Sequence, residues 1–367
     1  MLPEFKLERF FAEHEFSAKH LLCSSDCQSM SVGKLLDFEP QSREQFFDLH
    51  LGYTESPGSP TLRAEIAKLY DNISAEDVVV FAGAQEGILL FLQGQLAADD
   101  HAIVHWPCYQ SLFEVAHSAG GSVDRWTTDA SNDWALDLNQ LDSLIRPNTK
   151  VIVVNTPHNP TGYLFSHEDW ANLHSLAAER GVLVFCDEVY RESEQNPEDR
   201  LTAGCDMGSH GVSLGVMSKT YGLAGLRIGW VASQNADVIG RLRAMKDYTS
   251  ICNSAPSEFL AELALRHRQR LVERSLGIIK LNLESLDRFF QTHPDQFHWV
   301  RPKAGAIAFP ELTTGEAIEP FCERLLKETG VLLAPGTMFD DPGNHFRLGF
   351  GRRDFAEGLA KIESWMG

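Results

Sequence analysis

Lys219 lies near the start of the segment Ser218 to Trp230, just after the apolar run at residues 211–217. This position makes Lys219 a candidate for covalent chemistry. Lysines avoid protein interiors unless they are paired or functional, and a desolvated lysine has a lowered pKa and can form Schiff bases. The glycines after Lys219 allow a ligand to approach the backbone closely, and Arg227 supplies a cation for a phosphate. The alternative is a surface lysine in a glycine-rich turn, and this segment alone does not decide between the two.

Two other polar clusters also follow predicted strands. Asp187 ends the apolar run Val182–Cys186, where an unpartnered carboxylate is costly, so we expect a cationic partner such as a protonated ring nitrogen. Tyr190, three residues later, could hydrogen-bond an oxygen on the same ring. Asn159 lies in a rigid turn between two prolines, which positions its side chain as a donor. The alternatives are a helix cap for Asp187 and a plain turn residue for Asn159.

Together these motifs resemble those of the class I and II aminotransferases, which are fold type I enzymes that depend on pyridoxal 5′-phosphate (PLP). The motifs occur in family order and at family-like spacing over all but about the first fifty residues. The residues that carry the match are Lys219, Arg227, Asn159 (in the Asn-Pro-Thr-Gly turn), Asp187 and Tyr190. The resemblance implies that Lys219 holds PLP as an internal aldimine and moves a proton between the substrate α-carbon and C4′ of the cofactor.

The resemblance also implies roles for residues around the cofactor ring. Asp187 would keep the pyridine nitrogen protonated, so that the ring acts as an electron sink. Asn159 and Tyr190 would hydrogen-bond the phenolic oxygen of the ring, and Asn159 would also contact the substrate. Tyr109 matches the aromatic residue that stacks on the ring, with ordinary core packing as the alternative.

A second group of residues would bind the phosphate and the substrate. The backbone N–H groups of Ala84 and Gln85 open a predicted helix and would bind the phosphate together with Arg227. Tyr53 resembles the tyrosine that reaches the phosphate of the neighbouring subunit, which implies a homodimer with shared active sites. Arg347 resembles the arginine that takes the substrate α-carboxylate in a bidentate grip, and the alternative is a surface arginine on a strand.

Two features depart from the family pattern. Many relatives have a phosphate-binding serine three residues before the lysine, whereas this chain has Val216, and Ser218 is the candidate to supply part of that contact. The opening Leu22–Ser29 replaces a glycine-rich segment that lies over the substrate. It resembles a subgroup that includes capreomycidine synthase, which uses the same fold to cyclise an arginine derivative. This departure leaves the type of reaction undecided, whereas the expected cofactor remains PLP.

Helical and strand patterns alternate from about residue 61 onward, and these elements must position the residues above. Apolar runs predict buried strands within 77–83, 102–106, 150–155, 182–186, 211–217 and 227–233, and amphipathic spacing predicts helices within 61–70, 86–96 and 168–180. This alternation predicts an α/β fold with a mostly parallel central sheet and helices on both faces. Ligands bind such sheets at the carboxyl ends of the strands, where these polar clusters occur.

The pattern changes after Arg241. Residues 258–290 predict one long helical stretch, short strands are predicted within 299–310, 331–335 and 345–350, and an amphipathic helix within 354–366. These elements predict a smaller α+β unit. The first forty residues show no sheet of their own and would pack beside it. We therefore predict a large PLP-binding domain over residues 41–245 and a small domain from residues 1–40 and 246–367.

Composition limits the partners and the compartment. The 367 residues carry 32 Lys and Arg against 51 Asp and Glu, and a net charge of −19 repels a phosphate backbone, so we expect no nucleic-acid partner. No apolar run reaches the length of a membrane span and the N-terminus has no secretory pattern, so we expect no membrane partner. Seven cysteines without a C-x-x-C pair predict reduced thiols in the cytoplasm and no metal site.

The predicted function is transfer of an amino group between an α-amino acid and a 2-oxo acid by a ping-pong mechanism. The first alternative is another PLP reaction on the same scaffold, namely elimination, replacement or cyclisation of a basic amino acid. The second is a non-catalytic PLP-binding regulatory domain, which would need a basic DNA-binding segment for which little sequence precedes residue 51. Asp26, Glu55 and Glu86 would favour a basic substrate if one faced the site, but we expect all three to be solvated or capping.

Overall fold

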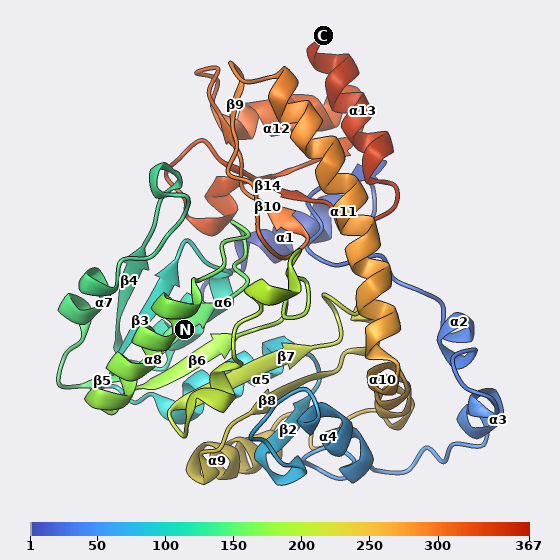
Figure 1. Ribbon diagram of the computed structural model, residues 1–367, viewed down its shortest axis with the longest axis vertical. Helices are drawn as coiled ribbons and strands as arrows, with labels where there is room; N and C mark the ends of the chain where they lie inside the picture. Colours follow the sequence, from blue (N-terminus) through green and yellow to red (C-terminus); the bar gives the residue numbers. More distant parts are fainter. Residues whose placement is uncertain (1) are drawn as a thin grey trace.

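The computed structural model describes residues 2–367 and has a central sheet flanked by helices (Figure 1). Within these residues the sheet has seven strands in the order β2-β8-β7-β6-β5-β3-β4. Strand β8 is antiparallel to both of its neighbours, and the other neighbouring pairs are parallel. The predicted α/β fold with a mostly parallel sheet is confirmed. The strands are β2 (Val78–Phe81), β3 (His101–Trp106), β4 (Ser122–Thr127), β5 (Thr149–Asn155), β6 (Leu183–Asp187), β7 (Gly211–Val216) and β8 (Gly229–Ala232).

Helices cover both faces of this sheet, so its central strands are apolar throughout. Val151 and Val153 of β5 belong to a core with α5 (Ala84–Gln95), α6 (Gln110–Ser118) and α9 (Ala236–Lys246). Ile152 and Val154 belong to the opposite core with α7 (Leu138–Leu144) and α8 (His167–Arg180). Alternate residues of a strand point to opposite faces, which explains why the buried strands read as continuous apolar runs.

The sequence prediction missed one edge strand and merged two helices. In β4 only Trp126 is buried, so this edge strand has no apolar run that could identify it. The predicted stretch 258–290 is two helices, α10 (Ala255–Arg266) and α11 (Arg268–Thr292), separated at His267. The two helices pack in different places, since α10 adjoins the core of β2 and β8, whereas most of α11 joins a separate C-terminal core.

The C-terminal elements build that separate core around short strands. It contains α11, α12 (Ile318–Thr329) and α13 (Phe355–Met366); α12 and α13 lie in the upper part of Figure 1, and α11 runs from there down towards α10. The short strands are β9 (Phe297–His298), β10 (Ile307–Ala308), β11 (Glu311–Leu312), β12 (Val331–Leu332), β13 (Ala334–Pro335) and β14 (Phe346–Gly349). The predicted strand at 299–310 is thus reduced to two residues. We keep the two-domain division of the chain as a prediction.

The N-terminal segment is tied to this C-terminal unit by backbone hydrogen bonds. Strand β1 (His20–Leu21) pairs in parallel with β12, so the first forty residues do contribute a strand, one too short to show a period in the sequence. Gly349 N donates to Leu22 O (2.7 Å), which places the residues after β1 beside β14. The remaining N-terminal helices are α1 (Lys6–His14), α2 (Val32–Leu36), α3 (Ser42–Phe47) and α4 (Pro60–Ala67). No helix within residues 2–367 is long and apolar enough to cross a membrane.

Candidate active site

A cavity of about 410 Å³ lies at the carboxyl ends of the central strands. It gathers most of the predicted site residues, which come from six separate parts of the chain: Ala84, Gln85, Tyr109, Asn159, Asp187, Tyr190, Ser218, Lys219, Arg227 and Arg347. Tyr53 is the exception. Its side chain is 92 % exposed and lines a different hollow at the start of α10.

Lys219 lies three residues after β7, and its amine is held inside this cavity. Nζ donates a hydrogen bond to Ser25 Oγ (2.8 Å). Burial lowers the pKa of Lys219, although the negative charge of Asp26 acts in the opposite direction. A lysine with a lowered pKa is a better nucleophile and proton carrier near neutral pH. Ser25 was not predicted as a site residue, because it lies 194 residues away from Lys219 in the sequence.

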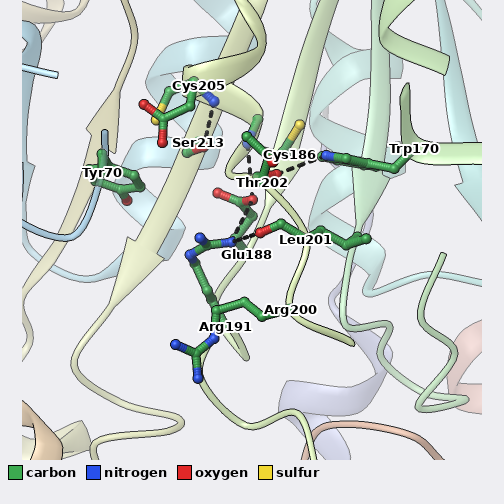
Figure 2. Close-up of polar contacts among 12 residues, drawn as sticks. Tyr70, Trp170, Cys186, Glu188, Arg191, Arg200, Leu201, Thr202, Cys205 and Ser213 are labelled. Atoms are coloured by element: carbon green, nitrogen blue, oxygen red, sulfur yellow. Dashed lines mark hydrogen bonds and ion pairs between the residues drawn. The ribbon is translucent and has the colours of Figure 1, made fainter. Parts of the chain in front are cut away.

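Two consecutive carboxylates follow β6, and they face in different directions. Asp187 lines the cavity, is 4 % exposed and accepts a hydrogen bond from Val189 N (3.2 Å). Burial raises its pKa to about 7, and no side-chain cation within residues 2–367 forms an ion pair with it. Glu188 instead accepts a hydrogen bond from Gly204 N (3.1 Å) and is not among the residues that line the cavity; Figure 2 shows the polar contacts around it.

The network around Glu188 anchors the chain next to Asp187. Arg191 Nη1 lies 3.9 Å from Glu188 Oε1 and donates a hydrogen bond to Leu201 O (2.7 Å) (Figure 2). Cys205 N donates to Ser213 Oγ (2.9 Å) in the same network. Burial raises the pKa of Glu188 as well. These contacts fix the loop after β6, and therefore the direction in which Asp187 points.

Arg347 on β14 is a buried cation held by neutral groups. It is 1 % exposed, donates to Cys23 O from Nε (3.1 Å) and Nη2 (2.8 Å), and donates to Asn159 Oδ1 from Nη1 (3.2 Å). No carboxylate within the described residues forms an ion pair with it. Asn155, which the prediction did not include, links the turn that carries Asn159 to the end of β6. Its Oδ1 accepts a hydrogen bond from Asn159 N (2.6 Å), and its Nδ2 donates one to Asp187 O (2.8 Å). A buried guanidinium without a carboxylate partner suits an anionic ligand.

Two tyrosines border the same space. The Tyr190 hydroxyl is buried and has no hydrogen-bond partner within residues 2–367, although it lines the cavity. Tyr109 donates from its hydroxyl to Glu8 Oε1 (2.7 Å) on α1. Burying a hydroxyl without a hydrogen-bond partner costs free energy of folding. We therefore expect a ligand oxygen or nitrogen to hydrogen-bond the Tyr190 hydroxyl.

The other end of the cavity can bind an anion. Helix α5 begins at Ala84 after Gly83, and a Cβ on Gly83 would lie 2.5 Å from Arg227 Nη2, so glycine is needed for the arginine to approach the helix N-terminus. Arg227 makes no ion pair within the described residues. Free N–H groups of the first helical turn and a guanidinium together bind phosphate well. Val216 also lines this cavity and can give no hydrogen bond from its side chain.

The N-terminal segment adds charged residues that sequence reasoning mostly missed. Glu8, Glu15 and Arg352 line the cavity without having been predicted. Asp26 was expected to be solvated or capping, and this expectation is wrong: Asp26 lines the cavity as an ion pair with Arg352 (2.9 Å). Glu86 lies outside, since it accepts from Ala82 N (2.6 Å) as a structural contact. Glu55 is also outside the cavity lining, and its side chain is 58 % exposed. The helical spacing of residues 7, 11 and 15 was the available signal for α1.

These features test whether PLP fits the cavity. The phosphate matches the helix N-terminus and Arg227, and a protonated ring nitrogen matches Asp187, a buried carboxylate without a cation. A ring oxygen matches the unpartnered Tyr190 hydroxyl. Lys219 supplies the amine. The described residues therefore provide one complementary group for each polar part of the cofactor.

Comparisons with known proteins agree with this fit. A family model described as aminotransferase class I and II matches residues 20–357. Capreomycidine synthase of Streptomyces vinaceus is 28 % identical over 370 residues, covering 100 % of this chain and 94 % of that protein. The aspartate aminotransferase of Pyrococcus abyssi is 27 % identical over 361 residues, covering 93 % of this chain and 90 % of that protein.

Two solved structures are similar over their whole length. A PLP-dependent aminotransferase from Streptococcus suis is 33 % identical, with a TM-score of 0.94 and coverage of 100 % of this chain and 98 % of that one. The PLP-dependent cyclase OrfR is 29 % identical, with a TM-score of 0.92 and coverage of 100 % and 97 %. The resemblance to the class I and II aminotransferases is confirmed, and capreomycidine synthase, whose subgroup the opening segment resembles, is among the similar proteins. The chain belongs to the class I and II aminotransferase family and is a PLP-dependent enzyme of that family.

Proposed function

We propose that this chain transfers an amino group between an α-amino acid and a 2-oxo acid by a ping-pong mechanism, with the residues of the cavity in the following roles. The main support for the proposal is that Lys219, Asp187 and Arg347 line one cavity. Each of the three is buried or partly buried, and none forms an ion pair within the described residues. PLP, when bound, supplies an electron sink for the pair left on the substrate α-carbon.

The chain would hold the cofactor at both ends. The N–H groups of Ala84 and Gln85, the Arg227 guanidinium and the Ser218 hydroxyl would bind the phosphate. At the ring, Asp187 would keep the nitrogen protonated. The ring oxygen and the ring face would be held by Tyr190, Asn159 and Tyr109.

Arg347 would orient the substrate, because a guanidinium presents two parallel N–H donors to a carboxylate. Its contacts with Cys23 O and Asn159 Oδ1 already fix the plane of the guanidinium. Lys219, once released from the cofactor, would move the proton between the substrate α-carbon and the cofactor. The Ser25 hydroxyl, which accepts from Nζ, would hold the amine in place between these events.

We propose a homodimer in which Tyr53 reaches the phosphate of the neighbouring subunit. Its support is the 92 % exposure of Tyr53 beside other exposed apolar side chains on the same segment, Leu51 at 81 % and Phe47 at 81 %. Large exposed apolar side chains in one segment favour an interface. We also place the protein in the cytoplasm, because all seven cysteines are free thiols and six of them are buried.

A second candidate function is cyclisation of an amino acid on the same cofactor. It is favoured by the names of two relatives, capreomycidine synthase and the cyclase OrfR, each of which matches this chain over its whole length. Lys219, Asp187 and Arg347 would serve either reaction, so the site alone does not separate them.

Product analysis with both kinds of substrate tests the proposal. Incubation of the holoenzyme with a panel of amino acids and a 2-oxo acid should yield a new amino acid and a new 2-oxo acid, with parallel double-reciprocal lines. Lys219→Ala should abolish this turnover and the cofactor absorbance that depends on the lysine. Turnover that survives in Lys219→Ala, or a cyclic product without amino-group transfer, would overturn it.

A further inference from the structure

A second cavity, of about 110 Å³, adjoins the active-site cavity. Val189 and Val216 line both cavities, so the segments that carry these two valines lie between them. One segment follows β6 and continues to Tyr190, and the other ends β7 and continues to Lys219. A polar contact at the second cavity can therefore fix these two segments relative to each other.

Each segment contains a tight turn that begins at a residue of the proposed site. The first turn begins at Tyr190 and is closed by a hydrogen bond from Ser193 N to Tyr190 O (3.1 Å). The second begins at Lys219 and is closed by a hydrogen bond from Gly222 N to Lys219 O (2.9 Å). Such a bond fixes the backbone of the four residues of a turn, so a residue inside the turn moves with the residue that begins it.

The third residues of the two turns are bonded to each other. The Tyr221 hydroxyl donates a hydrogen bond to Glu192 Oε2 (2.8 Å), and both side chains line the second cavity. Tyr221 is 6 % exposed and Glu192 9 %, so this contact is shielded from water. Burial and the charge of Glu192 raise the pKa of Tyr221, which keeps its hydroxyl protonated and able to donate. The contact ties the turn that begins at Tyr190 to the turn that begins at Lys219.

Glu192 has a backbone conformation that a glutamate disfavours. Its φ is 69°, and a positive φ at the third position of a turn favours glycine or asparagine. Its second carboxylate oxygen, Oε1, lies 3.8 Å from Arg200 Nη1 and 3.6 Å from Arg268 Nε, so two guanidinium groups orient the carboxylate. The backbone alone does not explain a glutamate at this position, whereas these side-chain contacts do.

The tie acts on the relative position of the Lys219 amine and the Tyr190 ring. Lys219 Nζ lies 5.8 Å from the centroid of that ring. The hydrogen bond to Ser25 Oγ holds the amine itself, whereas the contact between Tyr221 and Glu192 holds the backbone of the two turns. Neither Glu192 nor Tyr221 lines the active-site cavity, so both act on the site through other residues.

We propose that Glu192 and Tyr221 are positioning residues, which fix Lys219 relative to Tyr190 through the hydrogen bond between their side chains. The inference rests on the proposed function, which places Tyr190 at the ring oxygen of PLP and Lys219 at its reactive carbon. A hydrogen bond donated to the ring oxygen favours the negative charge on that oxygen. It therefore lowers the pH at which the lysine-bound cofactor loses its proton. Loosening the tie lets the Tyr190 hydroxyl move away from the ring oxygen and raises this pH.

A pH titration of the cofactor absorbance of the holoenzyme, without substrate, tests the proposal. Tyr221→Phe removes the donor of the tie, and Glu192→Ala removes the acceptor. We expect either variant to raise the midpoint of the absorbance change by about half a pH unit or more. In steady-state kinetics we expect kcat to fall about threefold to tenfold while KM stays within about twofold.

Two further variants assign the effect to the hydrogen bond. Glu192→Gln keeps a hydrogen bond to the Tyr221 hydroxyl, because an amide can accept from it or donate to it, and the midpoint should return to within about 0.2 pH units of the wild-type value. The double variant Tyr221→Phe, Glu192→Ala should shift the midpoint no further than the larger of the two single variants, because both remove the same contact.

Tyr70→Phe is the matched control. The Tyr70 residue lines the same second cavity (Figure 2), and its hydroxyl accepts a hydrogen bond from Trp230 Nε1 (2.8 Å), but it belongs to neither turn. This variant also removes a phenolic hydroxyl, so thermal melting should show a loss of stability like that of Tyr221→Phe. Its absorbance midpoint and its kcat should stay at the wild-type values.

Glu192→Ala is expected to fold, because the two arginines that it releases have other surroundings. Arg200 keeps its hydrogen bond from Nε to Glu194 Oε2 (3.1 Å), and the Arg268 side chain is 38 % exposed. Thermal melting checks each variant. If Glu192→Ala does not fold, Tyr221→Phe compared with Tyr70→Phe decides the matter, since neither changes a charge.

The outcomes separate this inference from the proposed function. A wild-type midpoint in a folded Tyr221→Phe, or an equal shift in Tyr70→Phe, would overturn the inference alone, because the first shows no positioning and the second shows a general loss of packing. If the absorbance change persists in Lys219→Ala, the proposed function fails and this inference fails with it.

Discussion

Asp187 and Glu188 are neighbours in the chain, both buried, and yet they face different surroundings. Only Asp187 lines the cavity, whereas Glu188 is bonded to Gly204 N behind it. Asp187→Asn should therefore lower kcat/KM by about 100-fold or more, because the charge that keeps the ring nitrogen protonated is lost. Glu188→Gln should mainly lower the free energy of unfolding, by about 1–3 kcal/mol. Steady-state kinetics and chemical denaturation of both variants would show this split, and equal kinetic losses would contradict it.

The raised pKa of Asp187 should also affect how the free energy of unfolding of the cofactor-free protein depends on pH. Its pKa is about 7 in the folded chain, against an ordinary value of 3.8. Between these values the folded state holds a proton that the unfolded chain has released, so the free energy of unfolding falls as pH rises, by up to about 4 kcal/mol from this group. In cofactor-free protein the wild type should lose stability relative to Asp187→Asn between about pH 4 and pH 7. Parallel curves for the two proteins would contradict the burial of an unpaired carboxyl.

The residues that sequence reasoning identified share one property, which is a position directly after a strand or within a family motif. Lys219, Asp187 and Asn159 all follow apolar runs, and parallel strands bring such ends together. Glu8, Glu15 and Ser25 could not be found in this way. They come from a segment that carries no family motif and follows no buried strand. The pairing of β1 with β12, more than 300 residues away, and the hydrogen bond from Lys6 N to Gln110 Oε1 help to hold this segment at the site.

At the scale of elements, the close approach of the N-terminal segment to β14 shapes the cavity. A Cβ on Gly349 would lie 1.7 Å from Ser24 O, so Gly349→Ala must displace the segment that carries Ser25 and Asp26. We expect it to destabilise the protein by about 1–3 kcal/mol and to weaken amino-acid binding. Gly277→Ala is the matched control in α11, where nothing lies within 4 Å, and it should stabilise by about 0.5–1 kcal/mol. Thermal melting and substrate titration measure both effects, and a neutral Gly349→Ala would contradict this packing.

Element prediction succeeded where burial gave a clear pattern and failed where it did not. The central strands and α8, with Ser166 as its N-cap and Gly181 at φ 67 after its end, follow the sequence closely. The edge strand β4 has a mostly exposed, polar pattern, and the break at His267 between α10 and α11 depends on which core each helix joins. The core against which a helix packs depends on tertiary contacts, which the local hydrophobic periodicity of the sequence does not reveal.

At the scale of the whole molecule, the proposed homodimer makes a prediction about shared sites. If Tyr53 serves the neighbouring subunit, Lys219→Ala and Tyr53→Ala chains should each have little activity alone. Mixed dimers would contain one site with both Lys219 and Tyr53 intact. Co-refolded equimolar chains should therefore recover roughly a quarter of wild-type activity, because half of the dimers are mixed and each has one intact site. Activity no greater than the sum of the separate variants would contradict shared sites, and sedimentation would report the mass of the assembly.

In the proposed function, Lys219 and its surroundings carry out amino-group transfer. The most direct measurement mixes the holoenzyme with a reactive amino acid in the absence of any 2-oxo acid acceptor, and quantifies the products per chain. We expect one equivalent of 2-oxo acid per active site, loss of the original cofactor absorbance, and then no further reaction until an acceptor is added. Continued release of ammonia or of a cyclic product without acceptor would contradict it and assign the cavity to another PLP reaction.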